Sequence, residues 1–268
     1  MSERGAHGTV HRVVVAIDDR PGASSAVEAA VQLASALDAR LTALFLENAD
    51  LIRAAALPFV HETGAVSGTV RPMAGTAMVR ALRNSAEEAR AAVATAAEAN
   101  GLVWQFEVVR GRRLAVISAM REALDLLVLA QTPGHLSADV LSAPFARDAA
   151  ADTAPVAVTV RNVPSAGRAL QAAQALAAAC DAPLVFLLCG HGVERIRRLR
   201  EFTEHALGGS PLRARYVTLQ SWNTQAIASA ARQHGARLLV WCDGDLRQDA
   251  QRLDALLTRL RCPLVVAD

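Results

Sequence analysis

Two consecutive carboxylates, Asp18 and Asp19, follow directly after an apolar, β-branched run at residues 13–17. Such a run is typical of a strand that is buried on both faces of a parallel sheet. Open α/β sheets bind ligands at the carboxyl ends of their strands, so both carboxylates stand where a ligand contact is expected. The same residues could instead supply loop polarity and negative charge at the start of the next helix.

Glycine and hydroxyl residues form a second group of candidates. Gly111 follows a predicted strand at 104–108, where it serves either a turn or the close approach of a ligand. Gly134, His135 and Ser137 stand at a predicted helix start, where backbone N–H groups can hold an anion.

Patterns for catalysis or metal binding are weak. Cys189 and His191 place a thiol near an imidazole, but a nucleophile–base pair needs a third, orienting group, and no orienting acid is evident in this glycine-flanked loop. No histidine has metal-ligand spacing such as His-Glu-x-x-His, which indicates surface or core histidines. The arginine-rich segment 193–207 also contains glutamates, so it is typical either of a solvated helix face or of a site for an anionic partner.

Alternating strands and helices must position these residues. Apolar runs predict strands, and apolar positions at helical spacing predict helices. The alternation predicts an α/β fold with parallel sheets and helices on both faces. Residues 47–77 contain scattered prolines and glycines and are expected to form a long irregular segment, in which residues 48–56 could form a short helix. The predicted strands are 12–17, 41–46, 104–108, 125–130, 156–160, 184–189, 213–219, 237–241 and 263–266, and the main helices are 24–37, 78–100, 114–123, 166–179, 193–207, 224–234 and 249–260.

The first strand–helix–strand unit returns 143 positions later without a gap, so that Val13 matches Val156. The later part of the unit matches at an offset of 112 instead, as if the second copy lacked the segment 47–77. The run 156–160 matches both the end of the first copy, as its fifth strand, and the start of the second. Either two strands are needed there or one copy is short of a strand. The repeat predicts two tandem domains, 1–153 and 154–268.

Composition bounds the remaining classes. The 268 residues are 52% hydrophobic, which is ample for packed cores. A formal net charge of +2 gives no electrostatic argument for a nucleic-acid partner. No apolar run approaches the ~20 residues of a membrane span, and the polar N-terminus lacks the apolar core of a signal peptide. We therefore expect a cytoplasmic chain with no membrane partner, whose four cysteines are reduced and buried.

In order and spacing, the segments VVVAID, LTALFLEN, VVRG, DLLVLA and APVAV resemble the universal stress protein family. The resemblance covers both halves and implies two tandem open parallel-sheet domains of the universal stress protein, adenine nucleotide α-hydrolase-like type. Nucleotide-binding members carry G-x-x-G-x(9)-G-[ST] after the fourth strand, and its N–H groups and hydroxyl cradle phosphates. Here only Gly134 is available, Pro133 has no N–H to donate, and Ser142 falls near the expected Gly-Ser.

The resemblance also implies that Asp18 is the acid that lies beside a bound nucleotide and contacts its ribose or adenine. The residue at the equivalent position of the second copy is Arg161. The implied ligands are ATP or AMP, with no cofactor certain. The leading interpretation is a non-catalytic, bacterial stress-response or regulatory protein whose nucleotide binding is weak or lost. The alternative is an adenine-nucleotide-binding protein that uses the first domain only. The residues implied at the site are Asp18, Gly111, Gly134, Ser137 and Ser142.

The resemblance has consequences for assembly as well. Single-domain members of the family pair through their last strands, so a tandem chain is expected to make that pairing internally, as a pseudo-dimer joined at strand five. A further homodimer and an unidentified protein partner are also expected.

Overall fold

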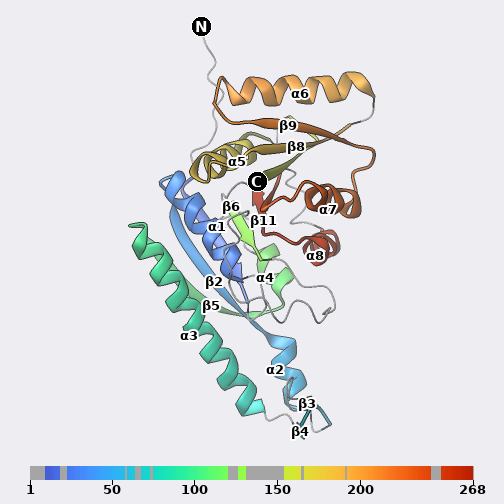
Figure 1. Ribbon diagram of the computed structural model, residues 1–268. Coiled ribbons are helices and arrows are strands. Elements are labelled where there is room, and N and C mark those ends of the chain that lie inside the picture. The colour runs from blue at the N-terminus through green and yellow to red at the C-terminus, as the bar shows by residue number, and fades with distance from the viewer. Residues whose placement is uncertain are drawn as a thin grey trace.

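A computed structural model describes residues 10–18, 23–57, 59–63, 68–72, 75–119, 126–130, 154–163, 166–190, 192–242 and 249–267. Within these ranges one nine-stranded sheet has the order β5-β2-β1-β6-β11-β10-β7-β8-β9 (Figure 1). The first half of the chain supplies one side of the sheet and the second half supplies the other. The strands are β1 (Arg12–Ile17), β2 (Arg40–Asn48), β5 (Trp104–Gly111), β6 (Leu126–Leu129), β7 (Val156–Val160), β8 (Leu184–Cys189), β9 (Ala214–Leu219), β10 (Leu238–Trp241) and β11 (Leu264–Ala267).

In this nine-stranded sheet the pairings within each half are parallel, and the halves meet at one antiparallel pair, β6 with β11. In that seam Leu129 lies opposite Leu264, and Leu126 lies opposite Ala267. Both strands are fully buried. The backbone hydrogen bonds of the seam therefore join two parallel half-sheets into one continuous sheet.

Helices cover both faces of the sheet, because successive side chains of a strand point to opposite faces. Val13 and Val15 of β1 belong to the hydrophobic cluster on one face, and Val14 belongs to the cluster on the other. Figure 1 shows the two helical layers. The first face is covered by α1 (Ala23–Ala36), α3 (Gly75–Ala99), α5 (Ala166–Ala179) and α6 (Val193–Leu207), and the second by α4 (Arg113–Ala119), α7 (Thr224–Gln233) and α8 (Ala250–Arg259).

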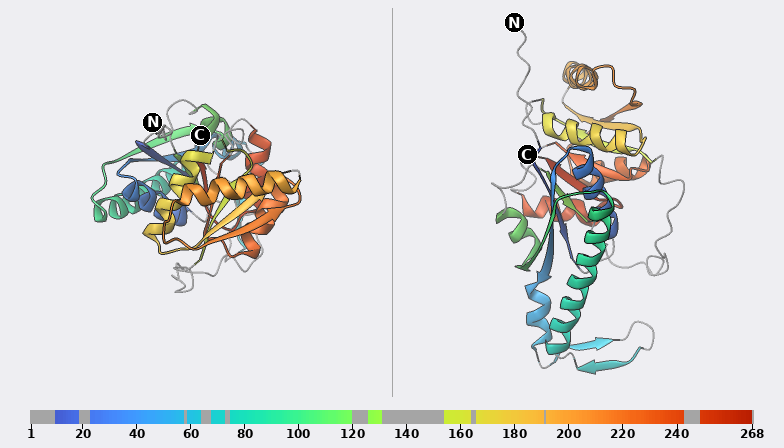
Figure 2. Two further views of the ribbon diagram at one scale, coloured as in Figure 1. Left: turned by 90° about the horizontal axis from the view of Figure 1, so that it is seen from above. Right: turned by 90° about the vertical axis from the view of Figure 1, so that its left-hand side faces the viewer.

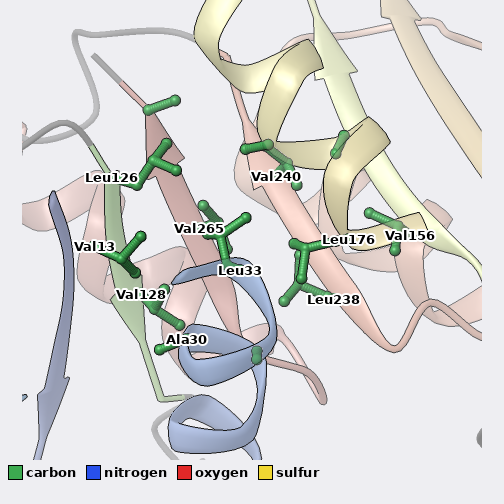
Figure 3. Packing of buried hydrophobic residues seen from close by; sticks show 14 of the residues in the cluster. Val13, Ala30, Leu33, Leu126, Val128, Val156, Leu176, Leu238, Val240 and Val265 are labelled. Carbon is green, nitrogen blue, oxygen red and sulfur yellow. The ribbon is translucent and has the colours of Figure 1, made fainter. Parts of the chain in front are cut away.

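The seam lies beneath α1 and α5, which pack against each other. Figure 3 shows Leu33 of α1, Leu176 of α5 and Val265 of β11 in one cluster with side chains of strands from both halves. Leu33, Leu176 and Val265 are each at most 2% exposed. One hydrophobic core therefore spans both copies of the repeat.

The repeat found in the sequence is also present in the backbone. Val13 pairs with Leu41 between β1 and β2, and Val156 pairs with Leu184 between β7 and β8, at the same offset of 143. After the helix of each unit, Asp38 and Asp181 adopt left-handed backbone conformations, with φ of 51° and 48°. These two residues are also 143 positions apart, so both copies make the same turn.

The run 156–160 begins the second copy, because β7 lies between β10 and β8. It does not form the fifth strand of the first copy. In the described part of the chain, the first copy contributes four strands to the sheet and the second contributes five. The position beside β6 is taken by β11, so the halves meet between β6 and β11 and not through two fifth strands.

The segment 47–77 contains regular structure within its described residues. It forms α2 (Ala49–Ala55) and a small antiparallel ribbon of β3 (His61–Thr63) and β4 (Val70–Pro72). Asn48 caps α2, since its side-chain oxygen accepts a hydrogen bond from the Asp50 N–H at 2.9 Å. Figure 2 shows that α2 and the ribbon of β3 and β4 project past the end of the sheet, beside the start of α3.

Candidate functional site

A cavity of about 390 Å³ opens where β1, β2 and β5 end. The strands are parallel, so their carboxyl ends meet at one edge, and Asp18 and Gly111 come together there. Of the other predicted site residues, Gly134, Ser137 and Ser142 lie outside the described residues. The cavity is lined by Asp18, Leu46, Asn48, Asp50, Gly111, Arg112, Arg113, Leu114 and Ala115.

Arg113 pairs with Asp18 inside this cavity. Its Nη1 lies 3.5 Å from Oδ2 of Asp18, and the two side chains are only 11% and 7% exposed. Its Nη2 also donates a hydrogen bond to the carbonyl of Ala130, directly after β6. A buried ion pair is stable only where further hydrogen bonds satisfy its polar groups, and the Ala130 carbonyl supplies one. A cation of the chain itself therefore holds the carboxylate that the resemblance assigns to a nucleotide.

Two further arginines close to Arg113 in the sequence form ion pairs with acids at the end of β2 and the start of α2. Arg110 Nη2 lies 2.9 Å from Glu47 Oε2, and Arg112 Nε lies 2.9 Å from Asp50 Oδ2. The sequence reasoning missed these residues and also Arg113. The sequence Arg-Gly-Arg-Arg at 110–113, shortly after the predicted strand 104–108, was the available signal.

Gly111 has a packing role at this edge. A Cβ at this position would lie 2.9 Å from Cγ2 of Val116, a side chain of α4. Glycine therefore allows α4 to start close against the end of β5. Since α4 carries Arg113 as its first residue, this close packing also fixes where the guanidinium enters the cavity.

The equivalent edge of the second half has different chemistry. A cavity of about 510 Å³ lies at the end of β7 and the start of α6, lined by residues that include Arg161, Arg195 and Arg198. Arg195 Nη2 donates hydrogen bonds to the Arg161 carbonyl at 3.1 Å and to Asn162 Oδ1 at 2.9 Å. Arg161 also lies over the ring of Trp222, 5.7 Å from its centroid.

Cys189 ends β8 near this cavity, and it is buried. Burial raises the pKa of its thiol, against the opposing effect of the guanidinium groups of Arg161 and Arg195. A raised pKa keeps sulfur protonated, which makes it a poor nucleophile. His191 lies outside the described residues. Across the described ranges, no group of three or more His, Cys, Asp or Glu side chains is placed to hold a metal ion, and no helix has the length and apolarity of a membrane span.

No protein-family model matches the sequence, and no curated protein matches it. Solved structures do. A universal stress protein from Archaeoglobus fulgidus DSM 4304 is 12% identical, covers 96% of both chains and has a TM-score of 0.55. The chain has the universal stress protein fold. A candidate universal stress protein from Pseudomonas aeruginosa UCBPP-PA14 is 13% identical over 98% of this chain and 95% of that chain, with a TM-score of 0.50.

The expectation of an α/β, universal stress protein-like fold is thereby confirmed over nearly the whole chain. At these identities the likeness concerns the fold alone. Any binding chemistry of this universal stress protein fold has to be argued from the residues at its own sheet edges.

Proposed function

We propose that the chain is a non-catalytic stress-response or regulatory protein of the universal stress type, with weak or lost nucleotide binding. One observation carries this proposal: Arg113 forms an ion pair with the Asp18 carboxylate inside the cavity at the ends of β1, β2 and β5. A nucleotide that used Asp18 would first have to separate two largely buried, opposite charges. Leaving either charge buried without its partner is unfavourable by several kcal/mol, which subtracts directly from nucleotide affinity.

Calorimetric titration with ATP, AMP, cyclic AMP and adenosine tests this proposal. We expect no saturable heat at about 1 mM of the nucleoside adenosine, because it can engage the Asp18 edge only through its ribose and base. In Arg113→Met, which frees the carboxylate, adenosine and AMP should bind measurably better than to the wild type. The matched control Arg110→Met should leave affinity unchanged, because Arg110 pairs with Glu47 and does not line the cavity. Tight adenosine binding by the wild type, lost in Asp18→Ala, would sink the proposal.

An adenine-nucleotide-binding protein that uses only the first domain is the second candidate. The cavity of about 390 Å³ beside Asp18 and the exposed guanidinium of Arg112 at its rim favour it. In that case Asp18→Ala should weaken adenosine and AMP binding, whereas Arg161→Ala in the second half should not weaken adenosine binding. ATP or AMP would then be the ligand.

Further parts of the proposal concern organisation and activity. We propose that the chain divides into two domains, 1–153 and 154–268. The internal β6–β11 pairing takes the place of a dimer between separate domains. We also propose that two copies of the chain form a further homodimer in the cytoplasm. Light scattering on a size-exclusion column measures the oligomer. Hydrolysis of ATP above a buffer blank that survives repurification and disappears in Asp18→Ala would contradict the absence of catalysis.

A further inference from the structure

A smaller cavity lies between the two halves of the chain. It measures about 190 Å³ and is formed by α1 of the first half together with α5 and the starts of β7 and β10 of the second half. It shares no lining residue with the cavity beside Asp18. Ligand sites occur preferentially between domains, and those for drug-sized molecules measure about 300–1,000 Å³. The volume of this seam cavity therefore suits a smaller molecule.

The inner wall of the seam cavity is apolar. Val156, Leu176 and Leu238 line it, and each is at most 3% exposed. Figure 3 shows these three side chains in the cluster beneath α5. Ala29 of α1 completes the wall from the first half and leaves room, because its side chain is a single methyl group. This wall can accommodate a short aliphatic group.

Two opposite charges line the same cavity from different halves. Glu28 belongs to α1 and is exposed, whereas Arg237 directly precedes β10 and is half-buried. They form no ion pair with each other, and no other charged side chain of the described ranges forms an ion pair with either. The backbone N–H of Arg237 donates to the Pro155 carbonyl at 3.0 Å, which fixes the position from which its side chain starts. A half-buried guanidinium without a carboxylate is poorly compensated, which favours an anionic group of a ligand beside Arg237.

A chain of side-chain hydrogen bonds orients the wall that carries Glu28. Sγ of Cys180, directly after α5, donates to Oε1 of Gln32 at 3.2 Å, and Nε2 of Gln32 donates to Oε1 of Glu28 at 3.4 Å. Gln32 lines the cavity and connects the two halves at this point. The second carboxylate oxygen of Glu28, Oε2, accepts no hydrogen bond from the residues that the structure describes, so it is available to a donor of a ligand.

We propose that the seam cavity binds a small aliphatic amino acid. The carboxylate of the amino acid accepts charge-assisted hydrogen bonds from Arg237, its ammonium group donates to Glu28, and its side chain lies against the apolar wall. Glu28 and Arg237 are the charged residues of this lining, and their formal charges cancel. A zwitterion therefore matches the site better than an ion of either sign.

The seam cavity needs no nucleotide and uses neither Asp18 nor Arg113. The proposal therefore goes beyond the proposed function and does not depend on it. Because residues of both halves line the cavity, a bound amino acid should stabilise the fold of the whole chain.

Thermal unfolding of the full chain with L-alanine, L-valine or L-leucine tests the site. We expect a Kd of about 1 mM for L-valine, so that about 10 mM of it raises the melting temperature by about 3 °C. Calorimetric titration then gives the Kd. Two analogues of valine serve as controls: 3-methylbutanoate lacks the ammonium group, and isobutylamine lacks the carboxylate. Each leaves one charge of the site unpaired and should raise the melting temperature by under about 1 °C.

Matched variants locate the binding. Arg237→Gln and Glu28→Gln each remove one charge of the site and should weaken L-valine binding about tenfold or more. Arg213→Gln is the control for the first, because the exposed Arg213 precedes β9 as Arg237 precedes β10 and does not line the cavity. Glu88→Gln, on the exposed face of α3, is the control for the second. Both controls should bind L-valine within about twofold of the wild type.

A fifth variant tests the volume alone. Ala29→Leu fills the cavity while it keeps both charges, so it should abolish the stabilisation by L-valine. Binding by Ala29→Leu as strong as that of the wild type would place the ligand elsewhere and would contradict the proposal. If Ala29→Leu does not fold by circular dichroism, the two charge variants and their controls decide.

Three other results overturn the site. One is a wild type whose melting temperature does not rise with any of the three amino acids. The second is an equal rise with an analogue that lacks one charge, and the third is an equal loss of binding in Arg237→Gln and Arg213→Gln. Adenosine titration of the same variants reports on the Asp18 edge, so failure of either proposal is recognised separately.

Discussion

Breaking the Asp18–Arg113 pair should destabilise the protein more than any other ion pair described at this edge. The two side chains are 7% and 11% exposed, so removing one partner leaves the other charge largely desolvated. Loss of one partner of a buried pair destabilises a protein by about 3–5 kcal/mol. The pair borders an open cavity, so we expect the lower end, about 3 kcal/mol, for Asp18→Asn. At about 2 °C per kcal/mol for a chain of this size, the melting temperature should fall by about 6 °C.

A double-mutant cycle isolates this interaction. Asp18→Asn and Arg113→Met each leave one buried charge, whereas the double variant leaves none. The double variant should therefore recover to within about 1 kcal/mol of the wild type, and with about 3 kcal/mol lost in each single variant the coupling is about 5 kcal/mol. Arg112→Met is the control, because its pair with Asp50 is exposed and should contribute under about 1 kcal/mol. Urea unfolding at pH 7 measures all four variants, and additive losses would refute the reasoning.

Three further predictions concern the core. Burial raises the pKa of Cys262 to about 12 from an ordinary value of 9.0, so the folded state keeps a proton that the unfolded chain releases. The contribution of Cys262 to the free energy of unfolding should be fully present below pH 9 and should be lost as pH rises from 9 towards 12, with about 1 kcal/mol lost at pH 10. Urea unfolding at several pH values measures this loss, which should be smaller in Cys262→Ala. An equal dependence on pH in the wild type and in the variant would contradict the role of Cys262. Val265→Ala at the seam should destabilise by about 2 kcal/mol, against under about 0.5 for the exposed Val193→Ala. Because one core spans both halves, tryptophan fluorescence and far-UV circular dichroism should give one coincident transition, and two separate transitions would show that the halves unfold independently.

The individual strands could be predicted from the sequence because their signal is local. The run 156–160 is apolar and β-branched, and β7 has these bounds. Its neighbours could not be predicted, because strand pairing depends on contacts far apart in the chain. The same apolar run suits the end of the first copy and the start of the second, and only its placement between β8 and β10 decides.

The candidate site divides in a similar way. Asp18 and Gly111 could be placed together because parallel strands end at a common edge. Arg113 could not, because its direction depends on how α4 docks. That docking rests on Ile117, which is 1% exposed, and on Val116 against Gly111. The ribbon of β3 and β4 was also missed, since three-residue strands are too short to give a periodic signal.

The contrast between the two edges follows from where each half places its cation. In the first half the cation arrives from α4, whose first residue is Arg113, and it neutralises the acid at the end of β1. The corresponding helix of the second half, α7, begins with uncharged Thr224 and Gln225. There the strand end itself supplies the cation, as the exposed Arg161. Core positions must stay apolar in both copies to close one sheet, whereas edge positions contribute little to that core. The repeat could therefore keep its backbone register while the residue after the first strand of each copy changed from the acid Asp18 to the guanidinium of Arg161.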